Sequence, residues 1–252
     1  MHSNDWDKLS ELDSLRAVID PNDRKGSKNF LIDLIHWNAL RDHLRQSKDV
    51  LDYGCGIGRY ARRITALGMN YSGIDPSNGM IQKAIALHGE KYFKHFDGKN
   101  IPFASESFDT VVLSEVLTYL LKTPCAEIAL KEIYRVLKPA GRLIMLEQAS
   151  ISGRKSESVS QIIKESDYTQ ALSGQFRIER IYKVRSPDFS AFTCRILDSP
   201  KVPLMAFKWI AGIVAHHEAA LVAKAKEDYF KTTSYYEFLI DAKVDKPSVT
   251  AS

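Results

Sequence analysis

Short apolar runs alternate along this 252-residue chain with stretches in which apolar residues recur every three or four positions. The runs have the length of buried strands and are bounded by polar or turn-forming residues, whereas the longer stretches have the period of amphipathic helices. Strands are predicted in the first 150 residues at 49–52, 71–75, 91–96, 108–113 and 142–146. Strands that alternate with helices predict an α/β fold with a mostly parallel sheet.

Further elements are predicted on either side of this alternation. Helices are expected at 5–19, 28–46, 124–137 and 159–172, and strands at 175–184 and 234–242. A hydrophobic content of 44% in a chain of this length supports one sizeable core. Residues 28–252 are therefore expected to form a single domain, preceded by a separate N-terminal segment at 1–27.

A glycine-rich turn follows the first predicted strand. The turn contains Gly54, Gly56 and Gly58 and is separated from the acid Asp52 by Tyr53 alone. Apolar residues at helical spacing follow directly. Such a turn lets a ligand lie on the backbone, where amides at a helix N-terminus point outward, and a nucleoside-type cofactor fits this geometry. The dinucleotide fingerprint G-x-G-x-x-G needs glycine where this chain has Arg59, so a pyrophosphate is disfavoured.

A carboxylate stands at the end of the second predicted strand. Asp75 lies about 20 residues beyond the first glycine of the turn, a spacing at which an acid can accept hydrogen bonds from both hydroxyls of a ribose. The following Pro76 ends the strand. The two features together predict a site for a ribose-containing cofactor.

Four motifs in a fixed order resemble those of a known family: LDYGCGIG at 51–58, GIDPS at 73–77, FDTVVLS at 108–114 and LKPAGRL at 137–143. The chain resembles the class I S-adenosylmethionine-dependent methyltransferases, and within them the small-molecule, ubiquinone-methyltransferase-like branch. One departure is Ala140, where most relatives have a second glycine. The resemblance implies a Rossmann-like seven-stranded, mostly parallel sheet with helices on both faces and an antiparallel last strand.

The resemblance also implies that S-adenosylmethionine is the cofactor and S-adenosylhomocysteine the product. The residues that it assigns to the cofactor site are Asp52, Gly54, Cys55, Gly56, Asp75, Met80, Asp97, Gly98 and Ser114. In this interpretation Met80 contacts the adenine and Asp97 accepts a hydrogen bond from its amino group. A core methionine and an ordinary Asp-Gly turn are the simpler alternatives for these two positions.

The catalytic residues are less clearly indicated. A sulfonium methyl is already activated, so alignment of the reactants is expected to supply most of the catalysis. For a hydroxyl acceptor a general base would help, and the candidates are Glu147 at the end of the fifth strand and His216 or His217 later in the chain, with Tyr119 orienting the acceptor. Many relatives have a histidine where this chain has Thr118-Tyr119, which leaves the base open.

Composition and local motifs narrow the classes of molecule with which the protein is expected to interact. A net charge of +4 is compatible with an anionic substrate, but no aromatic stacking platform accompanies the basic residues. The residues after the fourth strand, Ser114-Glu115-Val116, lack the two prolines and aromatic with which amino-methylating DNA enzymes hold a flipped base. The three cysteines are widely spaced and predict neither a disulfide framework nor a metal site. A nucleic-acid partner is therefore disfavoured and a small-molecule acceptor is predicted, while the oligomeric state stays open.

Two segments are expected to flank the site. Residues 1–27 are predicted to form a lid that becomes ordered when the cofactor binds. A helical insertion at about 186–230 contains the apolar stretch 202–215, which can cap the substrate side, pack as a core helix or contact a membrane surface. With no secretory signal and no apolar run long enough to span a membrane, the chain is expected to be cytoplasmic.

These observations predict an S-adenosylmethionine-dependent methyltransferase. Its acceptor is expected to be a small molecule, methylated on an oxygen of a sugar-like, phenolic or lipid-linked biosynthetic intermediate. Two alternatives stay open, an RNA methyltransferase and a catalytically silent protein that keeps a cofactor pocket for a regulatory or scaffolding role.

Overall fold

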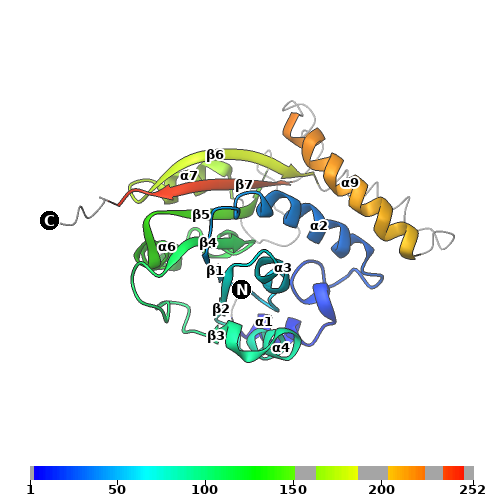
Figure 1. Cartoon of the computed structure of the whole chain (residues 1–252), viewed down its shortest axis with the longest axis horizontal. Helices are drawn as coiled ribbons and strands as arrows, with labels where there is room; N and C mark the ends of the chain where they lie inside the picture. The colour runs from blue at the N-terminus through cyan, green and yellow to red at the C-terminus, as the bar shows by residue number, and fades with distance from the viewer. Residues whose placement is uncertain (1–2, 151–162, 187–203, 225–234, 247–252) are drawn as a thin grey trace.

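The computed structural model describes residues 3–150, 163–186, 204–224 and 235–246, and it contains a seven-stranded sheet of order β3-β2-β1-β4-β5-β7-β6 (Figure 1). The strands are β1 (Asp49–Tyr53), β2 (Asn70–Asp75), β3 (Phe93–His95), β4 (Phe108–Ser114), β5 (Leu137–Ser150), β6 (Phe176–Arg185) and β7 (Tyr235–Val244). The α-helices are α1 (Ser3–Ser10), α2 (Ser27–Arg41), α3 (Ala61–Ala66), α4 (Asn78–His88), α5 (Leu117–Leu120), α6 (Pro124–Val136), α7 (Glu165–Leu172) and α9 (Leu204–Lys224). Two 3-10 helices, η1 (Ser14–Ala17) and η2 (Glu90–Tyr92), complete the described elements.

The directions of the strands confirm the predicted fold class. Strands β3, β2, β1, β4 and β5 are mutually parallel, whereas β7 pairs antiparallel with both β5 and β6. Because the order reverses at β1, the loops after β1 and β4 leave the sheet beside each other at its carboxyl edge. In open α/β sheets this is where ligands bind.

Alternate residues of the central strands enter two hydrophobic clusters on opposite faces of the sheet. Val50 of β1 and Val112 of β4 pack with α2, α3 and α9, whereas their neighbours Leu51 and Val111 pack with α5, α6 and α7. All four side chains are buried. A strand covered on both faces explains why the sequence shows continuous apolar runs here, without polar alternation.

The predicted helix at 5–19 is wrong in its extent. The chain forms α1, then a short link, and then the separate turn η1. The reason is tertiary, because Lys83 of α4 donates hydrogen bonds to the carbonyl oxygens of Ser10 and Leu12, which a continuous helix would use internally. Helix α1 therefore lies against α4, and the chain then turns through η1 toward α2 (Figure 1).

Helix α9 lies within the predicted insertion at 186–230. It packs against α2 and β6, where Phe207, Ala211 and Ala215 enter the same cluster as α2 (Figure 1). The flanking parts of the predicted insertion, 187–203 and 225–234, lie outside the described residues. None of the helices that the structure describes combines the length and apolar character that a membrane crossing requires.

An irregular turn at the start of β5, where the pairing register with β4 shifts, contains the departure noted in the sequence. Ala140 has a positive φ of 59°, a left-handed conformation that L-residues with a Cβ disfavour. The next residue must be glycine for a different reason, since a Cβ on Gly141 would lie 2.8 Å from the carbonyl oxygen of Lys138. The turn is therefore strained at Ala140.

We predict that Ala140→Gly increases the free energy of unfolding by about 0.5–1 kcal/mol, because glycine adopts positive φ without the steric cost. The matched control is Ala86→Gly on the exposed side of α4, where glycine is expected to lower it by about 0.5–1 kcal/mol. Urea titrations of both variants give the comparison. A decrease at both positions would show that Ala140 is not strained.

Candidate functional site

The carboxyl ends of β1, β2, β4 and β5 surround a cavity of about 560 Å³. Of the predicted cofactor residues, Asp52, Gly54, Cys55, Gly56, Asp75, Met80 and Ser114 all line it. Residues from the N-terminal segment, α2, β6 and β7 complete its wall. The cavity thus brings together residues that are far apart in the sequence.

The glycine turn after β1 is held open by its own backbone. Gly54 and Gly56 have positive φ angles of 74° and 53°, and the amides of Gly54 and Cys55 both donate to the carbonyl oxygen of Ile74 in β2. A Cβ on Gly54 would lie 2.6 Å from the side chain of Val116, so only glycine fits there. The backbone of the turn therefore forms one wall of the cavity directly.

Asp75 connects the glycine turn to α4. One carboxylate oxygen accepts from the amide of Gly56 at 2.9 Å and the other accepts from the amide of Ser77 at 2.8 Å. Burial raises the pKa of Asp75 to about 6, against the two amide hydrogen bonds, which lower it. Each oxygen has a second lone pair, so the carboxylate can still accept hydroxyl groups from a ligand in the cavity.

Asp52 is the second buried acid on this side of the cavity. It accepts a hydrogen bond from the Tyr71 hydroxyl at 2.8 Å, and burial raises its pKa to about 6. Met80 is fully buried and packs with Ile57 beside the turn. These positions fit the cofactor assignments, although they leave the contact of each residue with a cofactor a prediction.

Asp97 and Gly98 do not line this cavity. The exposed Asp97 carboxylate accepts from the amides of Lys99 and Asn100 and from the Asn100 side chain, and these hydrogen bonds lower its pKa to about 2. This arrangement is the turn geometry that the sequence left open as the simpler alternative. The structure therefore does not bring Asp97 to the other cofactor candidates.

The N-terminal segment covers the glycine turn. Trp6, Leu9 and Val18 line the cavity and pack with Met80, and Val18 lies against Gly56. Asp7 fixes this segment to α4, because its carboxylate accepts from the Ser77 hydroxyl at 2.6 Å and from an amide of the first turn. A carboxylate at a helix N-terminus also interacts favourably with the helix dipole.

Charged residues gather at the opposite end of the cavity, where α2, β6 and β7 meet. Arg185 and His36 both donate to the Glu237 carboxylate, His36 at 2.7 Å. Arg59 in turn donates to the other ring nitrogen of His36, so the imidazole is neutral with its proton directed at Glu237. Burial lowers the pKa of His36, in agreement with a neutral ring.

Glu115 is a residue that the sequence reasoning missed. It follows β4 with a positive φ of 59°, which is rare for glutamate and is typical of functional sites. One carboxylate oxygen accepts from the Gln148 amide at 2.7 Å, while the other, Oε1, is buried without a hydrogen-bond partner. Its position directly after β4, at the carboxyl edge of the sheet, was the signal available in the sequence.

The three predicted catalytic residues do not lie together, and one of them, Tyr119, lines the cavity. Tyr119 contacts Trp6 edge to face. Glu147 is fully buried outside the lining, where it accepts from the amides of Val116, Leu117 and Thr118, and burial raises its pKa to about 7. His216 lies exposed on α9, also outside the lining. Glu147 thus fixes the loop after β4 through three amides.

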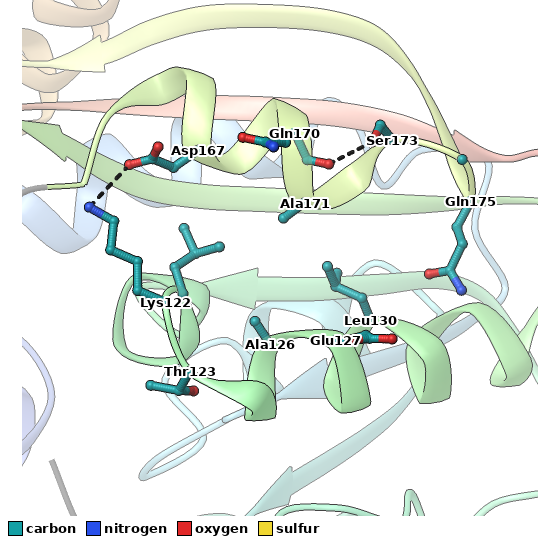
Figure 2. Close-up of a pocket in the computed structure, with 12 residues that line it drawn as sticks. Lys122, Thr123, Ala126, Glu127, Leu130, Asp167, Gln170, Ala171, Ser173 and Gln175 are labelled. Carbon is teal, nitrogen blue, oxygen red and sulfur yellow. Dashed lines mark hydrogen bonds and ion pairs between the residues drawn. The ribbon is translucent and has the colours of Figure 1, made fainter.

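A second cavity of about 610 Å³ lies between α6 and α7, away from the glycine turn (Figure 2). Its charged side chains are partly exposed, as in the pair of Lys122 and Asp167 at 3.6 Å. Among the described residues, no group of three or more histidine, cysteine or acidic side chains is arranged to hold a metal ion.

The sheet order, the glycine turn and the acid after β2 define a Rossmann-like, class I methyltransferase fold. Residues 51–145 match the family described as a methyltransferase domain. Residues 51–145 are therefore similar to a methyltransferase domain, in agreement with the motifs.

Named relatives fall in several branches of this family. The chain is 34% identical over 103 residues to a demethylmenaquinone methyltransferase of Streptomyces griseus, covering 41% of this chain and 44% of that protein. It is 30% identical over 159 residues to a tRNA U34 carboxymethyltransferase of Nautilia profundicola, covering 55% and 50%. The chain thus spans about half or less of the length of these relatives.

Solved structures extend the likeness over nearly the whole chain. A geranyl diphosphate C-methyltransferase of Streptomyces coelicolor, in complex with magnesium, geranyl diphosphate and S-adenosyl-L-homocysteine, matches with a TM-score of 0.61 at 17% identity. The match covers 96% of this chain and 95% of that one. At this identity the likeness concerns the fold.

We predict that Glu237→Gln lowers the free energy of unfolding at neutral pH by about 3–5 kcal/mol, because it removes one partner of the buried ion pair with Arg185. Burial disfavours the charge of Glu237, but Arg185 and His36 hold its pKa at about 2, below the ordinary 4.5. Its stabilisation is therefore complete above about pH 4.5 and is lost as the pH falls toward 2.

Urea titrations between pH 2 and pH 7 measure this effect, and the difference between wild type and Glu237→Gln should shrink at the acid end. Glu179→Gln is the matched control, since Glu179 pairs with Arg177 at the surface and should cost about 1 kcal/mol or less. Equal stability of wild type and Glu237→Gln at neutral pH would contradict the prediction.

Proposed function

We propose that this protein transfers the methyl group of S-adenosylmethionine to a small-molecule acceptor. The observation that carries the proposal is Asp75, a buried carboxylate that faces the cavity beside the glycine turn and still has lone pairs for ribose hydroxyls. The methyltransferase-domain match over the same residues agrees with this assignment.

The residues present fit such a methyl donor. Asp75 would hold the ribose, the backbone of Gly54 and Gly56 would lie under the donor, and Met80 would contact the base. Asp52, at the end of β1, is placed to accept hydrogen bonds from the ammonium group of the donor's amino-acid part. The donor supplies an activated methyl group, so the protein needs mainly to align it with the acceptor.

The acceptor would occupy the part of the cavity that is lined by Arg59, Glu115 and Tyr119. The N-terminal segment covers the turn and the cavity totals about 560 Å³, a size that suits a cofactor with a compact acceptor. The unpaired polar atoms of Arg59 and Glu115 favour a polar acceptor. We propose that methyl transfer is to an oxygen of a sugar-like, phenolic or lipid-linked intermediate, the acceptor class expected from the sequence.

A tRNA substrate is the second candidate, favoured by the carboxymethyltransferase relative. The two readings are distinguished by incubating the protein with radiolabelled S-adenosylmethionine and either a small-molecule extract or total tRNA. Label only in tRNA would overturn the small-molecule proposal, and label in neither fraction despite cofactor binding would favour the silent alternative.

We predict that Asp75→Asn weakens binding of S-adenosylhomocysteine by about 10- to 100-fold, the loss of a charge-assisted hydrogen bond of about 1.5–3 kcal/mol. Isothermal titration calorimetry measures the dissociation constant. The matched control is Asp109→Asn at the amino end of β4, whose carboxylate bonds Lys138 and two amides far from the cavity, and it should bind within about twofold of wild type.

Absence of binding to the wild-type protein would contradict the proposed cofactor. Equal weakening by the two substitutions would show that Asp75 does not face the ligand. Asp97→Asn adds a separate comparison. If this variant binds S-adenosylhomocysteine more weakly than wild type, Asp97 contacts the adenine, as the family resemblance implies.

The N-terminal segment is proposed to act as the lid predicted from sequence. Its residues Trp6, Leu9 and Val18 form part of the cavity wall, so a bound ligand would add contacts that hold it closed. We predict that saturating S-adenosylhomocysteine slows tryptic cleavage at the exposed Arg24 and Lys25 by roughly 10-fold or more, if cleavage needs the open segment.

Mass spectrometry of timed digests would follow this cleavage. The control is Asp75→Asn at the same ligand concentration, where the weaker binding should remove most of the protection. Equal cleavage of the wild type with and without ligand would contradict the lid.

A further inference from the structure

Two buried ionisable groups, the guanidinium of Arg59 and the carboxyl group of Glu115, line the cavity. Arg59 donates through one nitrogen, Nη2, to the Ser114 hydroxyl at 2.6 Å and to His36 at 3.2 Å. Glu115 accepts from Gln148 through one oxygen only. The remaining atoms, Arg59 Nη1 and Glu115 Oε1, are both buried and have no hydrogen-bond partner in the part of the chain that the structure describes.

Leaving buried polar atoms unpaired is costly, and such atoms at the wall of a cavity indicate a ligand that satisfies them. Here one donor and one acceptor stay open in the same cavity, near enough for each charge to affect the other. The ligand that fits them carries a proton directed at Glu115 and an oxygen directed at Arg59. A small hydroxyl compound with a second oxygen nearby has this chemistry.

Glu115 also lies where the methyl donor would bring its charge. Strands β2, β1 and β4 are neighbours in this order, so a ligand with its ribose at Asp75 that crosses the glycine turn reaches the end of β4. The part of the donor that follows the ribose is the sulfonium. In the proposed binding mode, the positive charge would lie within the cavity that Glu115 lines.

We propose that Glu115 removes the hydroxyl proton of the acceptor, and that the sulfonium of the methyl donor converts Glu115 to the carboxylate that can do so. The inference rests on the proposed function. In the step, the acceptor oxygen forms a bond to the methyl carbon while the carbon–sulfur bond breaks and leaves its electron pair on sulfur. The hydroxyl proton passes to Glu115 Oε1, so two charges, on sulfur and on the carboxylate, are neutralised together.

The surroundings of Glu115 support this coupling. Burial raises the pKa of the Glu115 carboxyl well above its ordinary value, and repulsion by Glu237 of β7 and Glu147 of β5 adds to this, whereas Gln148 and Arg59 oppose it. Without the donor, these surroundings therefore favour the protonated carboxyl over the carboxylate. A nearby positive charge favours the carboxylate, and its loss after methyl transfer favours retention of the proton.

Other ionisable groups around Glu115 do not replace it. The phenols of Tyr119 and Tyr168 interact electrostatically with Glu115, but burial raises the pKa of both, so they stay protonated. Glu147 also has a raised pKa and could compete for the role of general base. However, both of its oxygens already accept hydrogen bonds from backbone amides.

The test measures proton release when each cofactor form binds. S-adenosylmethionine and S-adenosylhomocysteine differ by the methyl group and the sulfonium charge, so contributions from Asp52 and Asp75 that both ligands share cancel in the difference. Calorimetric titrations at neutral pH in phosphate and in Tris, whose ionisation enthalpies differ, give the number of protons released. We expect up to about one more proton released per S-adenosylmethionine bound than per S-adenosylhomocysteine.

Glu115→Gln should abolish this difference while keeping the affinity for S-adenosylhomocysteine within about threefold, because glutamine keeps the size of the side chain and loses only the titrating group. Glu115→Asn is a second variant, since asparagine tolerates the positive φ at this position. The matched control is Asp109→Asn, which lies far from the cavity and should keep the difference. Glu147→Gln tests the competing acid, and thermal unfolding verifies that each variant is folded.

Equal proton release by the two ligands, or a difference that survives in both Glu115 variants, would overturn the inference while leaving the proposed function intact. A difference abolished only by Glu147→Gln would also overturn it and return the role to Glu147. Failure of both ligands to bind the wild type would remove the proposed function itself. Once an acceptor is identified, Glu115→Gln should slow methyl transfer by about 100- to 10,000-fold and remove the acid limb of the pH–rate profile.

Discussion

The two hydrogen bonds of the Asp75 carboxylate are the constraint on which the site depends. By accepting the amides of Gly56 and Ser77, this one side chain ties the glycine turn of β1 to the start of α4. Ser77 then donates to Asp7, so the same junction holds the N-terminal segment over the turn. A carboxylate that faces a cavity is thereby kept buried, and its satisfied amides make that burial affordable in free energy.

The two ends of the cavity differ in how completely their polar groups are paired. At the Asp75 end, the buried oxygens accept amide or hydroxyl donors and the surrounding surface is apolar. At the opposite end, Glu237 is paired with Arg185 and His36, which makes that part of the wall rigid. Arg59 and Glu115 each keep one buried atom without a hydrogen-bond partner among the described residues, and chemistry with an acceptor is expected beside them.

Glu147 illustrates how a residue can matter for function without touching a ligand. Its three amide hydrogen bonds shape the loop from Val116 to Thr118, directly after the strained Glu115. The strain at Glu115 costs about 1–3 kcal/mol and persists because the surrounding contacts hold it. We infer that Glu147 positions the loop that presents Glu115 and Tyr119 to the cavity, a role different from the general base expected at first.

The sequence by itself determined the sheet, the glycine turn and the acid after β2, because these depend on local patterns: apolar runs, positive-φ glycines and a spacing of about 20 residues. It could not decide between a pocket residue and a turn for Asp97, since both use the same Asp-Gly pair. It also could not find the pairing of His36 with Glu237, which are 201 residues apart, or place His216 outside the cavity. Tertiary structure decided these points, because burial and partner choice are properties of packed surfaces and not of neighbouring residues.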